Sequence, residues 1–223
     1  MNAPIPANEV RRLKVLWQYE VLDTVPEEIF DDLTELAARI CKAPVALISL
    51  VDEDRQWFKS KVGLTAAETS RDISFCGHAI NQSDLFIVPD ATKDKRFAGN
   101  PLVTSDPKIR FYAGAPLVTP DGYAVGTLCV IDQVPRELLS DQKEALRILA
   151  RHVVSQLELR RRTKELAEAR RLEAEARSQL AALRASLARA GRVSTRRRVT
   201  GTKPPRIAGR RDGRAGPASG KKS

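Results

Sequence analysis

The stretch Ser74–Ile80, written SFCGHAI, contains one of the three cysteines and one of the two histidines of this 223-residue chain. A thiol and an imidazole this close suggest a nucleophile with its base, or two ligands of a zinc ion. Ser74 is a suitable N-cap, which predicts a short helix reaching to about Asn81. Residues two apart on a helix diverge by about 200°, so Cys76 and His78 point apart. This divergence argues against a catalytic pair. Cys41, Cys129 and His152 lie far away in the sequence and form no second ligand pair, so we expect no catalytic residue and no metal ligand here.

Two alternative roles remain for Cys76. Near a helix N-terminus, free backbone N–H groups lower the pKa of a thiol, which favours a redox-sensitive residue or a contact with an anionic ligand. The alternative is a small hydrophobic side chain packed beneath a pocket. His78 is expected to be a packed or hydrogen-bonded wall residue.

Hydrophobic periodicity predicts the elements that must position this stretch. Helical spacing is seen over residues 9–22 and again up to residue 40, whereas Val45–Val51 is typical of a strand covered on both faces. This order of helices and hairpins indicates an α+β domain with a mainly antiparallel sheet and helices on its faces. Strands are expected at 45–51, 56–62, 85–88, 111–118 and 123–131, a short helix within 91–108, and an irregular segment at 64–73.

The chain shows no clear helix breaker between Glu137 and Gly191. The first part of this long helix is expected to pack on the sheet. The second part has a seven-residue repeat, which indicates a coiled coil and hence a homodimer through residues 159–190. A solvated single helix is the alternative. One heptad position is occupied by Leu159, Leu166, Leu180 and Leu187.

The net positive charge of the chain comes from its C-terminal residues. Residues 191–223 hold eleven Lys or Arg and one acid, whereas residues 1–190 hold 27 basic and 27 acidic residues. This tail has six Gly, three Pro and no aromatic residue, so it is predicted to be disordered. It suits nonspecific contact with nucleic acid through charge, or it acts only as a solubilising segment.

The N-terminal sequence MNAPIPANEVRRLK has no apolar region typical of a signal peptide. No window approaches eighteen apolar residues, so no membrane insertion is expected. An odd number of cysteines without a secretory signal favours reduced thiols and a cytoplasmic location.

Several blocks of this sequence together resemble the GAF domain family of small-molecule sensors, in the bacterial form found ahead of histidine kinases and diguanylate cyclases. The resemblance implies a six-stranded, mainly antiparallel sheet with a pocket between the sheet and the crossover segments. Together with the heptad repeat and the composition of the tail, the resemblance divides the chain into a flexible N-terminus at 1–8, the GAF domain at 9–158, a helical extension at 159–190 and a disordered basic tail at 191–223. Gly77 stands where this subgroup commonly has Ala. The resembling blocks are residues 19–40, 44–64, 74–80, 86–103, 109–132 and 149–160.

By this resemblance, the candidate pocket residues come from the short helix, the crossover loop and the strand that follows it. An Arg, an Asp and aromatic side chains around a cleft suit a small polar or anionic metabolite. The alternative is that the polar residues brace the loop and the aromatic residues belong to the core. The candidates are Phe75, Cys76, His78, Asp90, Arg96, Phe97, Asn100, Arg110 and Tyr112.

The expected function is that of a sensor, not an enzyme, which binds an unidentified small ligand and relays its state through a C-terminal dimer helix. No output module is recognisable, so a signalling kinase or cyclase would act in trans. One alternative is an enzyme like the free methionine sulfoxide reductases of this family, with Cys76 as attacking thiol and Cys129 reaching it through the fold. Another is a nucleic-acid-associated protein acting through the basic tail. The sequence names no cofactor.

Overall fold

The computed structural model describes residues 2–199, with side chains up to residue 189. The chain divides into two compact units, residues 1–168 and 169–223. The helices are α1 (Glu9–Gln18), α2 (Glu28–Cys41), α3 (Phe75–Ala79), α4 (Pro101–Thr104) and α5 (Ser140–Val199); the strands are β1 (Val45–Val51), β2 (Arg55–Val62), β3 (Glu68–Ser70), β4 (Phe86–Val88), β5 (Phe111–Val118) and β6 (Ala124–Asp132).

One sheet of six strands forms the centre of the first unit, in the order β3-β2-β1-β6-β5-β4. All neighbouring pairs are antiparallel. This confirms the predicted α+β class and the six-stranded sheet. Strand β1 lies at its centre, and its apolar run is buried on both faces, as the lack of polar alternation indicated.

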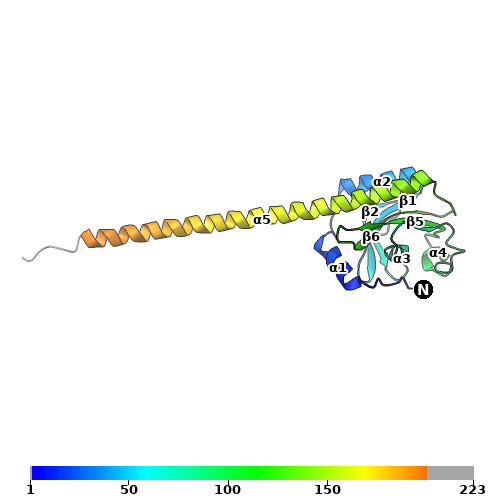
Figure 1. Cartoon of the computed structure of the whole chain (residues 1–223), viewed down its shortest axis with the longest axis horizontal. Coiled ribbons are helices and arrows are strands. Elements are labelled where there is room, and N and C mark those ends of the chain that lie inside the picture. The colour runs from blue at the N-terminus through cyan, green and yellow to red at the C-terminus, as the bar shows by residue number, and fades with distance from the viewer. Residues whose placement is uncertain (1, 200–223) are drawn as a thin grey trace, which may run out of the picture. The chain divides into compact units, whose positions relative to one another are not determined.

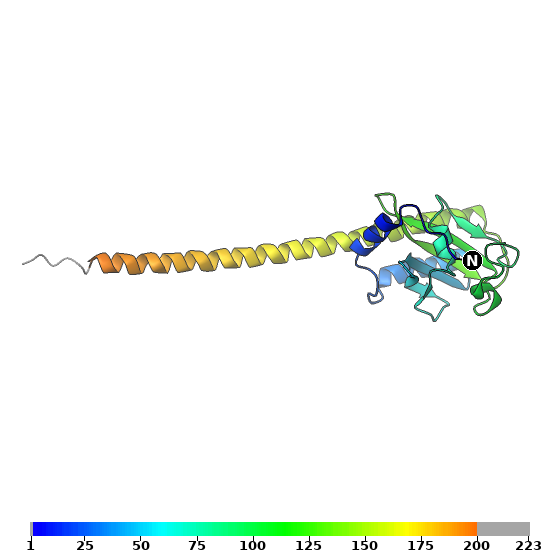
Figure 2. The ribbon, with the colours of Figure 1, turned by 90° about the horizontal axis from the view of Figure 1, so that it is seen from below.

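The two faces of the sheet carry separate hydrophobic cores. Helix α2 and the first part of α5 cover one face, and α3 with the crossover segments covers the other (Figures 1 and 2). Along β1, Ile48 and Leu50 belong to the first core, whereas Leu47 and Val51 belong to the second. This alternation follows from the two-residue period of a strand.

Strand β3 lies in the segment that the residue pattern indicated to be irregular. It consists of three residues, Glu68-Thr69-Ser70, and pairs with the start of β2. An exposed edge strand this short and polar has no hydrophobic alternation. The pattern of residues therefore missed it.

Strand β2 contains a β-bulge at Lys59. Ser60 pairs with Ile48 and Phe58 pairs with Ser49, so Lys59 is the extra residue. The bulge turns both Lys59 and Ser60 toward the α1–α2 linker and α2, where the Ser60 hydroxyl donates to Asp31. Phe58 belongs to the opposite core. Adjacent residues of β2 therefore pack on opposite faces of the sheet: Phe58 in the second core and Lys59 on the side of the α1–α2 linker.

A buried ion cluster fixes the N-terminal part of the chain. Glu9 accepts from the guanidinium of Arg12, with both distances 2.8 Å, and from Arg71 at 2.6 Å. Both arginine side chains are almost fully buried. Burial raises the pKa of Glu9, but the hydrogen bonds from Arg12 and Arg71 prevail and lower this pKa to about 2. Helix α1 is therefore held to the β3–α3 turn by charge.

Helix α3 matches the predicted short helix, and the Ser74 side chain accepts from the backbone N–H of Gly77. Ala3 is buried against this helix. A Cβ added at Gly77 would lie 2.7 Å from the Cβ of Ala3. The absence of a side chain at position 77 therefore makes room for the N-terminal segment.

Helix α5 continues to Val199, past its predicted end at Gly191. A single Gly costs about 1 kcal/mol in a helix, which neighbouring helix formers such as Ala and Arg can offset. Most of the predicted disordered basic tail, residues 200–223, lies outside the described residues, and its nucleic-acid contact stays a prediction.

Candidate functional site

A cavity of about 340 Å³ lies beside the second core, on the sheet face that carries α3. Its wall comes from β1, β2, β3, the loop between β2 and β3, α4, and the segments at the ends of β5 and β6. Most of this wall is apolar. The lining residues are Pro44, Val45, Leu47, Gln56, Phe58, Gly63, Leu64, Ala66, Thr69, Leu102, Asp106, Pro107, Ile109, Ile131, Asp132 and Gln133.

Gln56 is the buried amide of this wall, with 4 % of its surface exposed. Its Oε1 accepts from the Ser74 hydroxyl at 2.5 Å, and its Nε2 donates to Thr69 Oγ1 at 2.5 Å. Ser74 Oγ also accepts from the backbone N–H of Gly77 at 2.9 Å, so its single proton serves Gln56. In this arrangement the amide oxygen lies on the side of Ser74 and Ser49, and Nε2 lies on the Thr69 side.

The remaining polar wall lies at the far end of the cavity. Asp132 is ion-paired with Arg136 and accepts from the backbone N–H of Val134 at 3.1 Å. Gln133 donates to the carbonyl of Pro107 at 2.9 Å. Among the described residues, no Lys, Arg or His lines the cavity.

Four of the nine predicted pocket residues meet as a ring cluster in the second core. Phe75 stacks on Phe97 with centroids 4.0 Å apart and on Tyr112 at 5.2 Å, and His78 meets Phe97 edge-on at 4.7 Å. Burial, followed by the nearby charge of Arg96, lowers the pKa of His78. These rings fill the core behind the cavity and do not line it.

The four predicted polar residues brace the crossover loops. Arg96 is paired with Asp94 and lies over the rings of Phe86 and Phe97. Asn100 caps α4 and donates to the Ile73 carbonyl. The others act locally: Asp90 accepts from Thr92 and pairs with Lys93, and Arg110 donates to the carbonyls of Val103 and Ile109. None of the four lines the cavity.

Cys76 lies in a buried thiol pair. Its Sγ is 3.9 Å from Sγ of Cys129 and 3.4 Å from the Tyr112 hydroxyl. Burial raises the pKa of Cys76, while hydrogen bonds from Cys129, Thr127 and Tyr112 lower it, and the net direction is downward. The pKa of Cys129 is raised by its hydrogen bond with Cys76 and by burial. Neither thiol lines the cavity.

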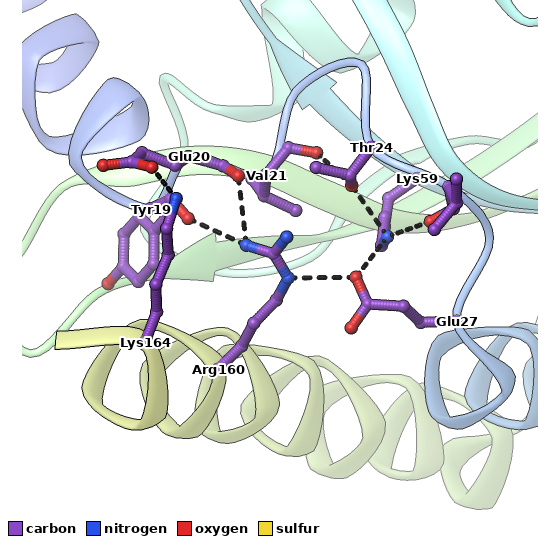
Figure 3. Close-up of polar contacts among 9 residues, drawn as sticks. Tyr19, Glu20, Val21, Thr24, Glu27, Lys59, Arg160 and Lys164 are labelled. Atoms are coloured by element: carbon purple, nitrogen blue, oxygen red, sulfur yellow. Dashed lines mark hydrogen bonds and ion pairs between the residues drawn. The ribbon is translucent and has the colours of Figure 1, made fainter. Parts of the chain in front are cut away.

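On the opposite face of the sheet, Lys59 forms a buried polar network (Figure 3). Its side chain is fully buried, and Nζ donates to Thr24 Oγ1 at 2.9 Å, the Val25 carbonyl at 2.8 Å and Glu27 Oε1 at 2.7 Å. The same Glu27 oxygen accepts from Arg160 Nε of α5 at 2.9 Å. Glu27 therefore joins β2 to α5.

Further contacts bind the same segment of α5 to the α1–α2 linker. The guanidinium of Arg160 donates to the carbonyls of Tyr19 at 3.1 Å and Glu20 at 3.0 Å (Figure 3). Lys164 pairs with Glu20, and the Tyr19 hydroxyl donates to Glu158. Leu157 is the last buried residue of α5 among the described side chains. We call the contacts of Lys59, Glu27 and Arg160 the latch.

The sequence reasoning overlooked the cavity wall and the latch. The available signal for the latch was Lys59, which directly follows the aromatic pair Trp57-Phe58 in a predicted strand, because a buried lysine needs a charged partner. Burial raises the pKa of Glu27, but the hydrogen bonds from Lys59 and Arg160 prevail and lower it.

Two classes of site are not found in the part of the chain that the structure describes. No group of three His, Cys, Asp or Glu residues there is placed to hold a metal ion. No helix there is long and apolar enough to cross a bilayer.

Comparison with known proteins gives the family. Residues 25–157 match the model of the GAF domain. A cyclic di-GMP phosphodiesterase of Pseudomonas aeruginosa is 40% identical over 166 residues, which is 74% of this chain but 28% of that protein. The GAF domain of an Acinetobacter phosphoenolpyruvate-protein phosphotransferase has a TM-score of 0.50 at 18% identity, covering 69% of this chain and 94% of that one. A far-red cyanobacteriochrome photoreceptor also reaches 0.50, at 16% identity, with coverages of 68% and 98%.

Proposed function

This chain belongs to the GAF domain family, and we propose that it is a cytoplasmic sensor in signal transduction. A small molecule binds in the cavity beside the second core, and its presence changes how the sheet holds α5. The buried thiol pair gives no support to an enzyme, because neither cysteine reaches the cavity wall. None of the nine residues predicted from the sequence lines the cavity; their rings pack in the second core and their polar groups brace the crossover loops.

This proposal rests on one observation: neighbouring residues of β2 point to opposite faces of the sheet. Phe58 lines the cavity, and the next residue, Lys59, enters the latch on the other face of the sheet. A ligand that moves Phe58 moves the bulge that places Lys59. Glu27 then transfers the shift to Arg160, just after the last buried residue of α5.

We propose that the sensor passes on its state by pairing with a second copy of the chain and by contacting a partner protein. Leucines of α5 at the predicted heptad position are about half exposed or more, Leu159 at 58 % and Leu187 at 64 % among them. We propose that residues 159–190 form a dimeric coiled coil. We propose a signalling kinase or cyclase as the partner; a relative is named a cyclic di-GMP phosphodiesterase, and this chain covers 28% of its length.

Native mass spectrometry of the protein purified from its own host tests the sensor. We expect a small molecule to be retained by the wild type and lost from Ala66→Phe, which fills the cavity from the β2–β3 loop. Ala98→Phe is the matched control, because Ala98 is exposed and does not line the cavity. Equal retention by all three proteins would place the molecule elsewhere and contradict the proposal.

A further inference from the structure

The chemistry of the cavity wall specifies the class of ligand. We propose that the cavity takes an uncharged, mainly apolar molecule with one hydrogen-bond acceptor that faces Gln56. This inference rests on the proposed function, because it concerns the same cavity. It differs from the polar or anionic metabolite that the sequence favoured.

The charged residues in the cavity wall argue against an anionic ligand. Among the residues that line the cavity, the charged ones are Asp106 and Asp132, both acidic. Arg136 neutralises Asp132 through an ion pair, and its guanidinium also donates to the carbonyls of Cys41 and Lys42. A phosphate or carboxylate in the cavity would lose its water without gaining a cation, which is strongly unfavourable.

The apolar wall defines the body of the ligand. Aliphatic side chains from the sheet, α4 and the loops line the cavity together with the ring of Phe58. The volume of about 340 Å³ lies near the lower end of the range of roughly 300–1,000 Å³ for ligand cavities. A compact molecule of one or two rings fits this space.

Gln56 supplies the polar contact that orients the ligand. Its Oε1 is occupied by Ser74, and Thr69 takes one proton of Nε2. A primary amide has two N–H protons. The second one is therefore available to a carbonyl, ether or hydroxyl oxygen of the ligand. This makes Gln56 the residue that selects a ligand with an acceptor over a pure hydrocarbon.

Three naphthalene probes of similar size test the class by isothermal titration calorimetry: 2-acetylnaphthalene, 2-ethylnaphthalene and 2-naphthoate. We expect the uncharged ketone to bind the wild type at least tenfold more tightly than the carboxylate. The ketone is also expected to bind more tightly than the hydrocarbon. If 2-naphthoate binds as well as the ketone, or if neither uncharged probe binds, the inference is overturned.

Two variants assign the acceptor contact to Gln56. Gln56→Glu keeps the shape and removes the Nε2 donor, and Gln56→Leu removes the whole amide. Either change should erase the advantage of the ketone over 2-ethylnaphthalene, while Gln133→Leu at the cavity rim should keep it. An unchanged advantage in the folded Gln56 variants contradicts the assignment.

The same probes separate this inference from the sensor proposal. If the ketone binds but Ala66→Phe does not weaken it, the ketone binds outside the cavity and the ligand class proposed here is wrong, whereas the sensor proposal is decided by retention of the host molecule. If a molecule retained from the host is lost from Ala66→Phe and carries a carboxylate or phosphate, the sensor stands and the ligand class proposed here is wrong.

Discussion

The carboxylate of Glu27 lies 2.9 Å from the guanidinium Nε of Arg160, across a sequence separation of 133 residues. The same oxygen accepts from Lys59, whose ammonium group has no exposure to water. A buried ammonium group with a single carboxylate partner depends on that partner. Glu27 is thus the central residue of the latch, and its removal has effects on both the sheet and α5.

Glu27→Gln should destabilise the protein and loosen α5. Loss of the charge leaves Lys59 buried without a counterion, so the free energy of unfolding should fall by about 3 kcal/mol, the lower end of the usual range because Glu27 is partly exposed. Amide hydrogen exchange of residues 158–168 should accelerate in the variant. Glu35→Gln is the control, because the Glu35–Arg39 pair is exposed and is worth less than about 1 kcal/mol. Equal effects of the two substitutions would show that the latch does not hold α5.

Acid should weaken the fold through Glu9. The pKa of this carboxyl is lowered from 4.5 to about 2, so its stabilising effect is complete above pH 4.5 and is lost as the pH falls through 2. We expect urea denaturation to report a loss of up to about 3 kcal/mol over this range. Glu9→Gln should flatten this part of the pH profile. A variant with the same pH dependence as the wild type would contradict the assignment.

Gly77→Ala should destabilise the protein although Ala favours a helix by up to about 1 kcal/mol. The added Cβ would come to 2.7 Å from Ala3 Cβ and displace the N-terminal segment, at a cost of about 1–3 kcal/mol. In an Ala3→Gly background the clash disappears, so Gly77→Ala should then stabilise. A double-mutant cycle by thermal denaturation measures this reversal. The prediction fails if the sign is the same in both backgrounds.

The three cysteines should react slowly with an aromatic disulfide reagent in the native state. Cys41, Cys76 and Cys129 are each at most 2 % exposed. Burial also raises the pKa of Cys41 to about 11, which disfavours its thiolate. Rapid reaction of all three is expected only in denaturant. A thiol that reacts quickly in the native protein would revive a redox role, with Cys76→Ser identifying the residue.

Charged substitutions on the heptad should abolish the proposed dimer. Leu180→Lys with Leu187→Lys should shift sedimentation equilibrium from dimer to monomer, because both leucines occupy one heptad position. Leu139→Lys is the control, since this leucine is exposed and precedes α5. A wild type that is already monomeric at micromolar concentration would support the single-helix alternative.

The sequence predicted the elements that have a local signature. The strands at 45–51 and 111–118 match, because a continuous apolar run needs cover on both faces. The cap of α3 by Ser74 also matches, since capping depends only on residues within one turn.

The cavity wall and the latch have no such signature. Leu64, Ala66 and Pro107 are ordinary loop residues until the fold brings them to one side of the sheet. The latch depends on a bulge, which shifts the register of β2 in a way that no period of residues reveals. The need for glycine at position 77 becomes visible only in the folded chain, where Ala3 leaves no room for a side chain there.

The bulge has a further consequence for the sensing mechanism proposed above. Gln56 and Phe58 face the cavity, whereas the extra residue Lys59 faces Glu27. In this arrangement, recognition and transmission occupy different positions of one strand. Under the proposed mechanism, substitutions at positions 56 and 58 would change the ligand while position 59 keeps its contact with Glu27, so one output mechanism would serve many chemical inputs.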